Sequence, residues 1–200
     1  MQRFLGAVGA DKHFAIWLVG VMCGLRRGEL VGLRWSDVDL EARSLRVEQS
    51  IVPHRGGAVI HPPKRNSRRT VALGEACVAA LREHRTRQLA HRLAVGPLWC
   101  DYNLVFPSER GTAIHPDNLT HYFREMAEQA GMPALTLHGL RHTAASMAIA
   151  AGVDLTVVSD QLGHSTTAIT ADFYVHVKDR TKRQAADAVD EMVFGTRLAR

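Results

Sequence analysis

The stretch FAIWLVGVMCGL (14–25) constrains the fold more than any other feature of the chain, because it has no polar face to turn toward water. A helix that is apolar on all sides lies in a protein core or in a membrane. This stretch is shorter than the roughly 20 residues that a membrane helix needs, and it contains two glycines. It also does not follow the basic start that is typical of a secretion signal. We therefore expect a buried helix over 11–23, ending near Gly24, in a cytoplasmic protein.

The pattern changes from helical to strand-like after a second short helix, RGELVGL (27–33). The segments SLRVEQSIV (44–52), GAVIHPP (57–63) and RRTVALG (68–74) are short and bounded by Pro, Gly, Asn and Ser. They predict a small three-stranded antiparallel sheet, in which KRNS (64–67) forms the hairpin turn between the last two strands.

The rest of the chain has the composition and periodicity of helices. The glycines at 131 and 152 and the aspartate at 154 are stop and start signals. Strands followed by a run of helices favour an α+β fold over an alternating βα fold, so we expect a mostly α domain over 1–200. The expected helices cover 75–93, 115–131, 139–151, 154–162, 166–175 and 179–193.

The charge balance indicates a polyanionic partner. The formal net charge is +5 and the sequence pI is near 9.5, with arginine dominating the basic residues. Arginine is the better bidentate phosphate ligand, so nucleic acid is favoured over a membrane surface. The three cysteines show no CxxC spacing, which argues against a disulfide framework or a zinc knuckle and suits a reducing compartment.

A set of basic and nucleophilic side chains matches the needs of one reaction, although each member alone has an ordinary structural explanation as a core, cap or surface residue. Attack on a phosphodiester builds negative charge that two arginines can neutralise with forked hydrogen bonds. A lysine can protonate the leaving sugar oxygen. A free phenol is only about one part in a thousand ionised at pH 7, so a tyrosine nucleophile needs help from a histidine and from the arginines. The candidates are Arg26, Lys64, His138, Arg141, His164 and Tyr174.

Four segments of the chain resemble, in their residues and in their order along the sequence, the signature of the tyrosine recombinase (phage integrase) family. The similarity runs from about residue 10 to about residue 180. The chain departs from the family pattern at Gly139, where similar proteins often have aspartate. Arg65 is a second basic residue next to the candidate lysine, Lys64. The segments are CGLRRGELVGLRW (23–35), PPKRNSRRTVAL (62–73), HGLRH (138–142) and LGHSTTAITADFYVHV (162–177).

The resemblance implies a catalytic domain that cuts and rejoins double-stranded DNA without metal or ATP. It implies Arg26 as the first catalytic arginine, supported by Glu29, and Lys64 as the hairpin lysine. It also implies His138 and Arg141 as an HxxR pair, His164 as the second histidine and Tyr174 as the nucleophile of a 3′-phosphotyrosyl link. Family members usually carry N-terminal core-binding and arm-binding domains. Nothing in this chain resembles either, so we expect a single catalytic domain, excised or naturally short, from a phage or mobile element.

Two alternatives remain open from the sequence: a type IB topoisomerase-like nicking and closing enzyme, and a DNA-binding regulator that has lost catalysis. The spacing of the histidines at 138, 142, 164 and 176 fits no HExxH zinc motif, so no metal or other cofactor is expected. The expected partners are a DNA recombination site and further copies of the chain, as a nucleoid-associated tetramer, with no membrane and no small-molecule substrate. The amphipathic tail (177–195) either packs on its own domain or docks onto a neighbouring copy.

Overall fold

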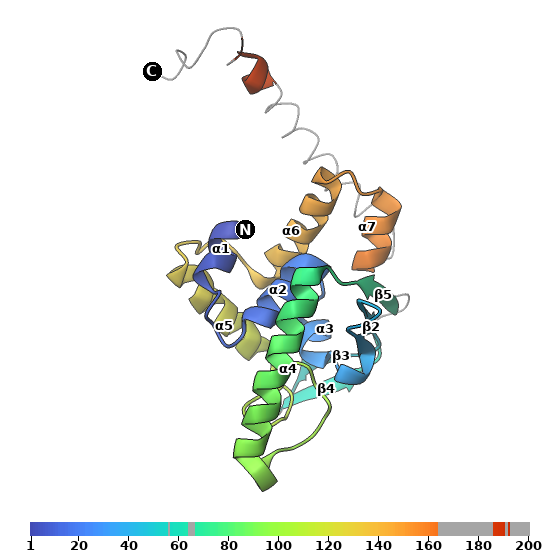
Figure 1. The fold of residues 1–200 in the computed structure, drawn as a ribbon, viewed down its shortest axis with the longest axis vertical. Coiled ribbons are helices and arrows are strands. Elements are labelled where there is room, and N and C mark those ends of the chain that lie inside the picture. Colours follow the sequence, from blue (N-terminus) through green and yellow to red (C-terminus); the bar gives the residue numbers. More distant parts are fainter. Residues whose placement is uncertain (56, 64–66, 164–185, 191, 193–200) are drawn as a thin grey trace.

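The computed structural model describes residues 1–55, 57–63, 67–163, 186–190 and 192. In these ranges helices surround one central helix, and two small antiparallel sheets lie toward one side (Figure 1). The predicted α+β class, mostly helical, is confirmed. The helices are α1 (Gln2–Ala7), α2 (Phe14–Cys23), α3 (Arg27–Gly32), α4 (Glu75–Val95), α5 (Pro116–Gln129), α6 (Leu137–Ala150) and α7 (Leu155–Leu162), with short 3-10 turns η1 (Trp35–Asp37) and η2 (Gly96–Leu98).

Helix α2 is the buried apolar helix that the sequence predicts. It contacts α1, α3, α4 and α6, and residues on all of its sides are buried, including Trp17 and Val19. It ends where Gly24 adopts a left-handed conformation with φ of +62°. A side chain at this position would also collide with Leu162 at the end of α7. Gly24 therefore ends the helix and allows α7 to pack closely against it.

The strands form two sheets, and this corrects the predicted pairing. A three-stranded antiparallel sheet exists, but its order is β1-β2-β5, while β3 and β4 form a separate antiparallel pair. The predicted hairpin of 57–63 with 68–74 is wrong, because the strands on either side of KRNS lie in different sheets. The strands are β1 (Val38–Asp39), β2 (Ser44–Val47), β3 (Ser50–His54), β4 (Gly57–His61) and β5 (Arg69–Ala72).

The single strand predicted over 44–52 is divided because the chain changes sheets between β2 and β3. Gln49 lies at this junction, and its side-chain amide donates to the carbonyl oxygen of Gly32 at the end of α3, at 2.8 Å. This bond ties the start of β3 to α3, whereas β2 stays paired with β5. A periodicity of two continues through the junction, so the pattern alone does not reveal it.

The predicted helices within the described ranges are confirmed. Asp154 caps α7, as predicted, by accepting a hydrogen bond from the backbone of Thr156 at 2.7 Å. The helix predicted over 166–175 lies outside the described residues. Of the helix predicted over 179–193, residues 186–190 and 192 are described and helical. No helix in the described part of the chain is long and apolar enough to cross a bilayer.

Candidate active site

Arg26 lies at the start of α3, where the bend at Gly24 and Leu25 turns the chain out of the core helix. Its backbone N–H donates to Glu29 Oε2 at 2.9 Å, and its side-chain Nη1 donates to Glu29 Oε1 at 2.8 Å. The Glu29 side chain is only 2% exposed, whereas that of Arg26 is 38% exposed. Glu29 thus caps the helix and holds the arginine, while the arginine still reaches the surface.

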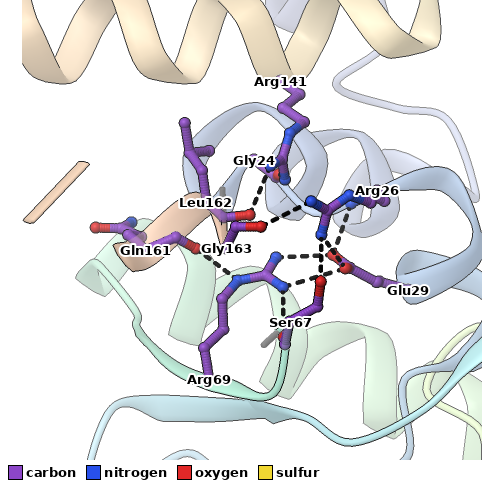
Figure 2. A network of polar contacts seen from close by, with 9 residues as sticks. All are labelled: Gly24, Arg26, Glu29, Ser67, Arg69, Arg141, Gln161, Leu162 and Gly163. Carbon is purple, nitrogen blue, oxygen red and sulfur yellow. Dashed lines mark hydrogen bonds and ion pairs between the residues drawn. The ribbon is translucent and has the colours of Figure 1, made fainter. Parts of the chain in front are cut away.

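Arg69, at the first position of β5, grips the same carboxylate from the other side (Figure 2). Its Nη2 donates to Glu29 Oε2 at 2.7 Å and its Nη1 to Glu29 Oε1 at 3.1 Å, a forked geometry that fits a carboxylate. Ser67 joins the two arginines, because its hydroxyl accepts from Arg26 Nη1 and its carbonyl oxygen accepts from Arg69 Nη1.

Glu29 is ionised despite its burial. Burial alone would raise the pKa of this carboxyl, but the hydrogen bonds and charge of Arg69, with further hydrogen bonds from Arg26, lower the pKa below its ordinary value. The carboxylate is therefore a fixed negative charge between two guanidinium groups, and both arginines are oriented by it.

The C-terminal end of α7 is held by three arginines from distant parts of the chain. Consecutive carbonyl oxygens of residues 161–163 accept one hydrogen bond each: from Arg69 Nε at 2.7 Å, from Arg141 Nη2 at 2.6 Å and from Arg26 Nη2 at 2.7 Å. Figure 2 shows the three guanidinium groups converging on this end of the helix. The last carbonyl groups of a helix lack partners within it and carry partial negative charge, so cations are favourable there. We call Arg26, Arg69, Arg141 and Glu29 the arginine network.

Arg141 is the most buried arginine of the predicted set, at 5% exposure. Its Nη1 donates to the carbonyl oxygen of Gly24 at 2.7 Å, so it also fixes the bend before Arg26. Burial and the nearby positive charge of Arg26, partly offset by Glu29, lower the pKa of Arg141 to about 9. The side chain is therefore still cationic at neutral pH, and because it is buried, its charge is poorly solvated, which costs free energy. An anion beside it would relieve this cost.

A cleft of about 510 Å³ opens beside the network. Its walls include Arg26, Glu29, Ser67 and the exposed His138, near the start of α6. Apolar residues, among them Ile51 and Val52, make up much of the rest. His138 lies edge to face with His142, one helical turn further, with ring centroids 4.6 Å apart. Burial and the positive charges of His138 and Arg141 lower the pKa of His142. The cleft thus places the Arg26 guanidinium group and the His138 imidazole around one opening, where the first can bind an anion and the second can transfer a proton.

The structure brings four of the residues singled out from the sequence into one place and leaves three outside its description. Arg26, Glu29 and Arg141 belong to the arginine network, and His138 faces the adjoining cleft. His138 and Arg141, the expected HxxR pair, lie three residues apart at the start of α6, but Arg141 points into the protein while His138 is exposed. Lys64, His164 and Tyr174 lie outside the described residues.

Arg69 and Ser67 were not identified from the sequence, although a signal for Arg69 exists. Residues 69, 71 and 73 share one side of an extended segment, and Val71 and Leu73 are buried. An arginine in line with two core residues is expected to have a buried partner. That partner, Glu29, lies 40 residues earlier in the chain.

The chain matches a known protein family and several curated relatives. The model of the phage integrase family matches residues 10–181. The chain is 34% identical over 205 residues to a XerC-like tyrosine recombinase of Caldanaerobacter subterraneus subsp. tengcongensis, covering 96% of this chain and 52% of that protein. It is 36% identical over 184 residues to an integrase of Streptomyces ambofaciens, covering 86% of this chain and 46% of that protein. The chain thus spans about half the length of these curated relatives.

Two solved structures are similar in fold. XerA recombinase superposes with a TM-score of 0.72 at 28% identity, over 94% of this chain and 61% of that one. The Tn1549 transposon integrase, solved in complex with transposon right end DNA, gives a TM-score of 0.75 at 24% identity, over 94% of this chain and 63% of that one. The ordered motifs, the fold and the match of the family model over most of the chain lead to one conclusion: the chain belongs to the phage integrase family.

Proposed function

We propose that this chain is the catalytic domain of a site-specific DNA recombinase, which cuts and rejoins strands through a covalent link to Tyr174. The observation that carries the proposal is the arginine network, in which Arg26 and Arg141 meet at the end of α7, directly before His164 in the sequence. Relatives named as tyrosine recombinase and integrase, and a fold neighbour solved with DNA, support the same function.

In the proposed reaction, the Tyr174 phenol oxygen bonds to phosphorus as the bond to the 5′ oxygen breaks. Arg26 and Arg141 neutralise the charge that develops on the non-bridging oxygens, and His164 adds a hydrogen bond to the same phosphate. We assign the phenol proton to His138, which opens on the cleft beside Arg26. The phosphodiester energy is kept in the phosphotyrosine, so the same steps in reverse join a new strand.

We assign the proton of the leaving 5′ oxygen to Lys64. Pro63, immediately before this lysine, and Ser67, three residues after it, both line the cleft. The lysine lies outside the described residues, and its assignment rests on its place in the sequence between these two. Its long side chain and ammonium group are suited to proton donation to an alkoxide.

The proposed partners are double-stranded DNA and further copies of the chain, acting as a tetramer on the nucleoid. The net positive charge of the chain, with Arg26 and Arg27 in the wall of the cleft, suits a phosphate backbone. In the described part of the tail, Val189 is 59% exposed and Met192 is 89% exposed, so both are available to a neighbouring copy.

Covalent trapping tests the proposal. The 200-residue chain is incubated at low salt with a pool of nicked duplexes whose central sequence is randomised, so that a short cleaved strand diffuses away. A denaturing gel is expected to show a protein–DNA adduct that is absent from Tyr174→Phe, and sequencing of the trapped DNA gives the preferred site. Binding in a mobility-shift assay without any adduct would contradict the proposal and favour a DNA-binding regulator.

A second assay separates recombination from nicking and closing. Two duplexes of the trapped sequence with different end labels are mixed with the protein. Strands that carry both labels support recombination, whereas relaxation of a supercoiled plasmid without label exchange supports a topoisomerase-like activity.

A further inference from the structure

We propose that Arg69 is a positioning residue for the cleavage reaction: it orients Arg26 through Glu29 and fixes the end of α7 from which the chain continues to His164. The inference rests on the proposed function, because it concerns how the same site is held. Arg69 itself is 6% exposed at its side chain and does not line the cleft, so it is not expected to touch DNA.

The first argument is the shared carboxylate. Glu29 receives two hydrogen bonds from Arg69 and two from Arg26, so both of its oxygens are used by both arginines. Without Arg69, Glu29 would keep only its bonds to Arg26 and could rotate with it. Because the planar guanidinium group of Arg69 holds the Glu29 carboxylate through two hydrogen bonds, both carboxylate oxygens stay fixed as acceptors for Arg26.

The second argument is the reach of the Arg69 guanidinium group. The same side chain that grips Glu29 also donates to the carbonyl oxygens of Ser67 and Gln161. Ser67 is a wall of the cleft, and Gln161 lies in the last turn of α7. One planar group therefore sets the relative positions of α3, the segment before β5, and α7. These three elements carry or adjoin Arg26, Lys64 and His164.

The third argument is close packing. The Arg69 guanidinium group lies against Gly163, where an added Cβ would be 2.9 Å from Nη1 and 3.0 Å from Cδ. The guanidinium group therefore packs directly against the end of α7, and a residue larger than glycine at position 163 would displace one of the two. Lysine can supply the charge at this site but not the fork, since an ammonium group cannot reach three separated acceptors at once.

The test measures the rate of covalent adduct formation at saturating trapped duplex for Arg69→Lys and Arg69→Gln. Both variants are expected to lose about 10- to 100-fold in rate with little change in DNA affinity, because a small misplacement of a catalytic group has an effect of this size. Arg68→Gln is the matched control. It changes the neighbouring residue, whose side chain is 70% exposed and pairs with Glu48, and it is expected to keep the wild-type rate.

A double-variant cycle separates positioning from a general loss of structure. If Arg69 acts through Glu29, the Glu29→Gln and Arg69→Gln losses do not multiply, and the double variant is about as slow as the worse single variant. Losses that multiply would overturn the proposal. Wild-type rates in both Arg69 variants would also overturn it. If Arg69→Gln does not fold, Arg69→Lys, which keeps the buried charge, tests the proposal through its rate of covalent adduct formation.

A measurement without DNA keeps the inference separate from the proposed function. In ¹⁵N spectra of the arginine side chains, the Arg26 guanidinium group of the wild type is expected to rotate slowly, since its two terminal nitrogens are bonded to Glu29, Ser67 and Gly163. Arg69→Lys is expected to lose this slow rotation, and an unchanged Arg26 signal would overturn the inference. A wild type that forms no adduct would count against the proposed function alone, and this spectrum would then decide the positioning role.

Discussion

The arginine network and the ion pairs of α4 use the same residue types with opposite physical consequences. Around Glu29, the carboxylate is 2% exposed and Arg69 is 6% exposed, and each group has several partners. On α4, Arg82 pairs with Glu41 at 2.6 Å, a distance as short as any in the network, but the side chains are 55% and 87% exposed. Arg87–Glu83 and Arg92–Asp101 are similarly open to water.

Distance therefore does not rank the strength of these interactions, whereas burial and the number of shared partners do. An exposed pair exchanges water contacts for a weak attraction in a medium of high dielectric constant. A buried carboxylate without its arginines would be left desolvated and uncompensated, so removal of either arginine is expected to lower the free energy of unfolding substantially.

The largest effect is expected from Arg26→Gln. In the proposed reaction Arg26 neutralises charge that develops on the phosphate, so its loss should reduce the cleavage rate about 10²- to 10³-fold. The rate of adduct formation on the trapped duplex at saturation measures it. Arg82→Gln is the matched control from the exposed set, and an equal loss there would mean that overall charge, not the network, sets the rate.

Glu29→Gln should cause the largest loss of stability. It leaves Arg69 buried without a counter-charge, which is expected to cost about 3 kcal/mol and to lower Tm by about 6–12 °C. Thermal unfolding at pH 7 provides the measurement. A Tm within a degree of the wild type would show that the network contributes no more than a surface pair.

The same variant should change the acid limb of stability. The folded-state pKa of Glu29 is lowered by Arg69 and Arg26, so the unfolded chain binds this proton more readily and stability falls as the pH drops below the ordinary value of about 4.3. Wild type and Glu29→Gln should therefore differ most at neutral pH and approach each other on acidification. Unfolding curves between pH 3 and pH 7 test this, and a constant difference across the range would refute it.

Gly24→Ala should have an intermediate effect. The left-handed backbone at this position and the collision with Leu162 are together expected to cost about 2 kcal/mol. Gly152→Ala is the matched control, because it has φ of +81° with no atom near the added Cβ, and strain alone should cost about 1 kcal/mol there. Only Gly24→Ala should also slow cleavage, since α7 and its arginine contacts would shift.

The smallest effect is expected from Arg82→Gln on stability. An exposed pair contributes about 0–1 kcal/mol, and raising the salt concentration should remove most of this. Chemical denaturation with and without added salt measures the difference. A loss comparable to that of Glu29→Gln would remove the contrast between the two regions.

The sequence predicted the elements better than their pairing. The all-apolar stretch and Gly24 were sufficient for α2, and Asp154 for the start of α7, because these signals are local. The division of 44–52 between two sheets was not predictable, since it depends on a contact between Gln49 and Gly32 across the fold. Pairing is decided by such non-local contacts, which alternation along one strand does not encode.

The same distinction applies to the site. The motifs indicated Arg26, Glu29, His138 and Arg141, and the structure brings these residues together. Arg69 was missed because its partner is distant in sequence, and the buried direction of Arg141 depends on the carbonyl groups of Gly24 and Leu162. Every residue carries a backbone carbonyl group, so the residue types in a motif do not predict which carbonyl oxygen accepts a hydrogen bond from an arginine.

The proposed covalent link to Tyr174 is tested most directly by identifying the residue that is bonded to DNA. The trapped adduct is digested with trypsin and nuclease, and the modified peptide is sequenced by mass spectrometry. We expect one nucleotide remnant, joined through its 3′ phosphate to Tyr174, at a yield that falls with Arg26→Gln and not with Arg68→Gln. A link to another residue, or through a 5′ phosphate, would contradict it.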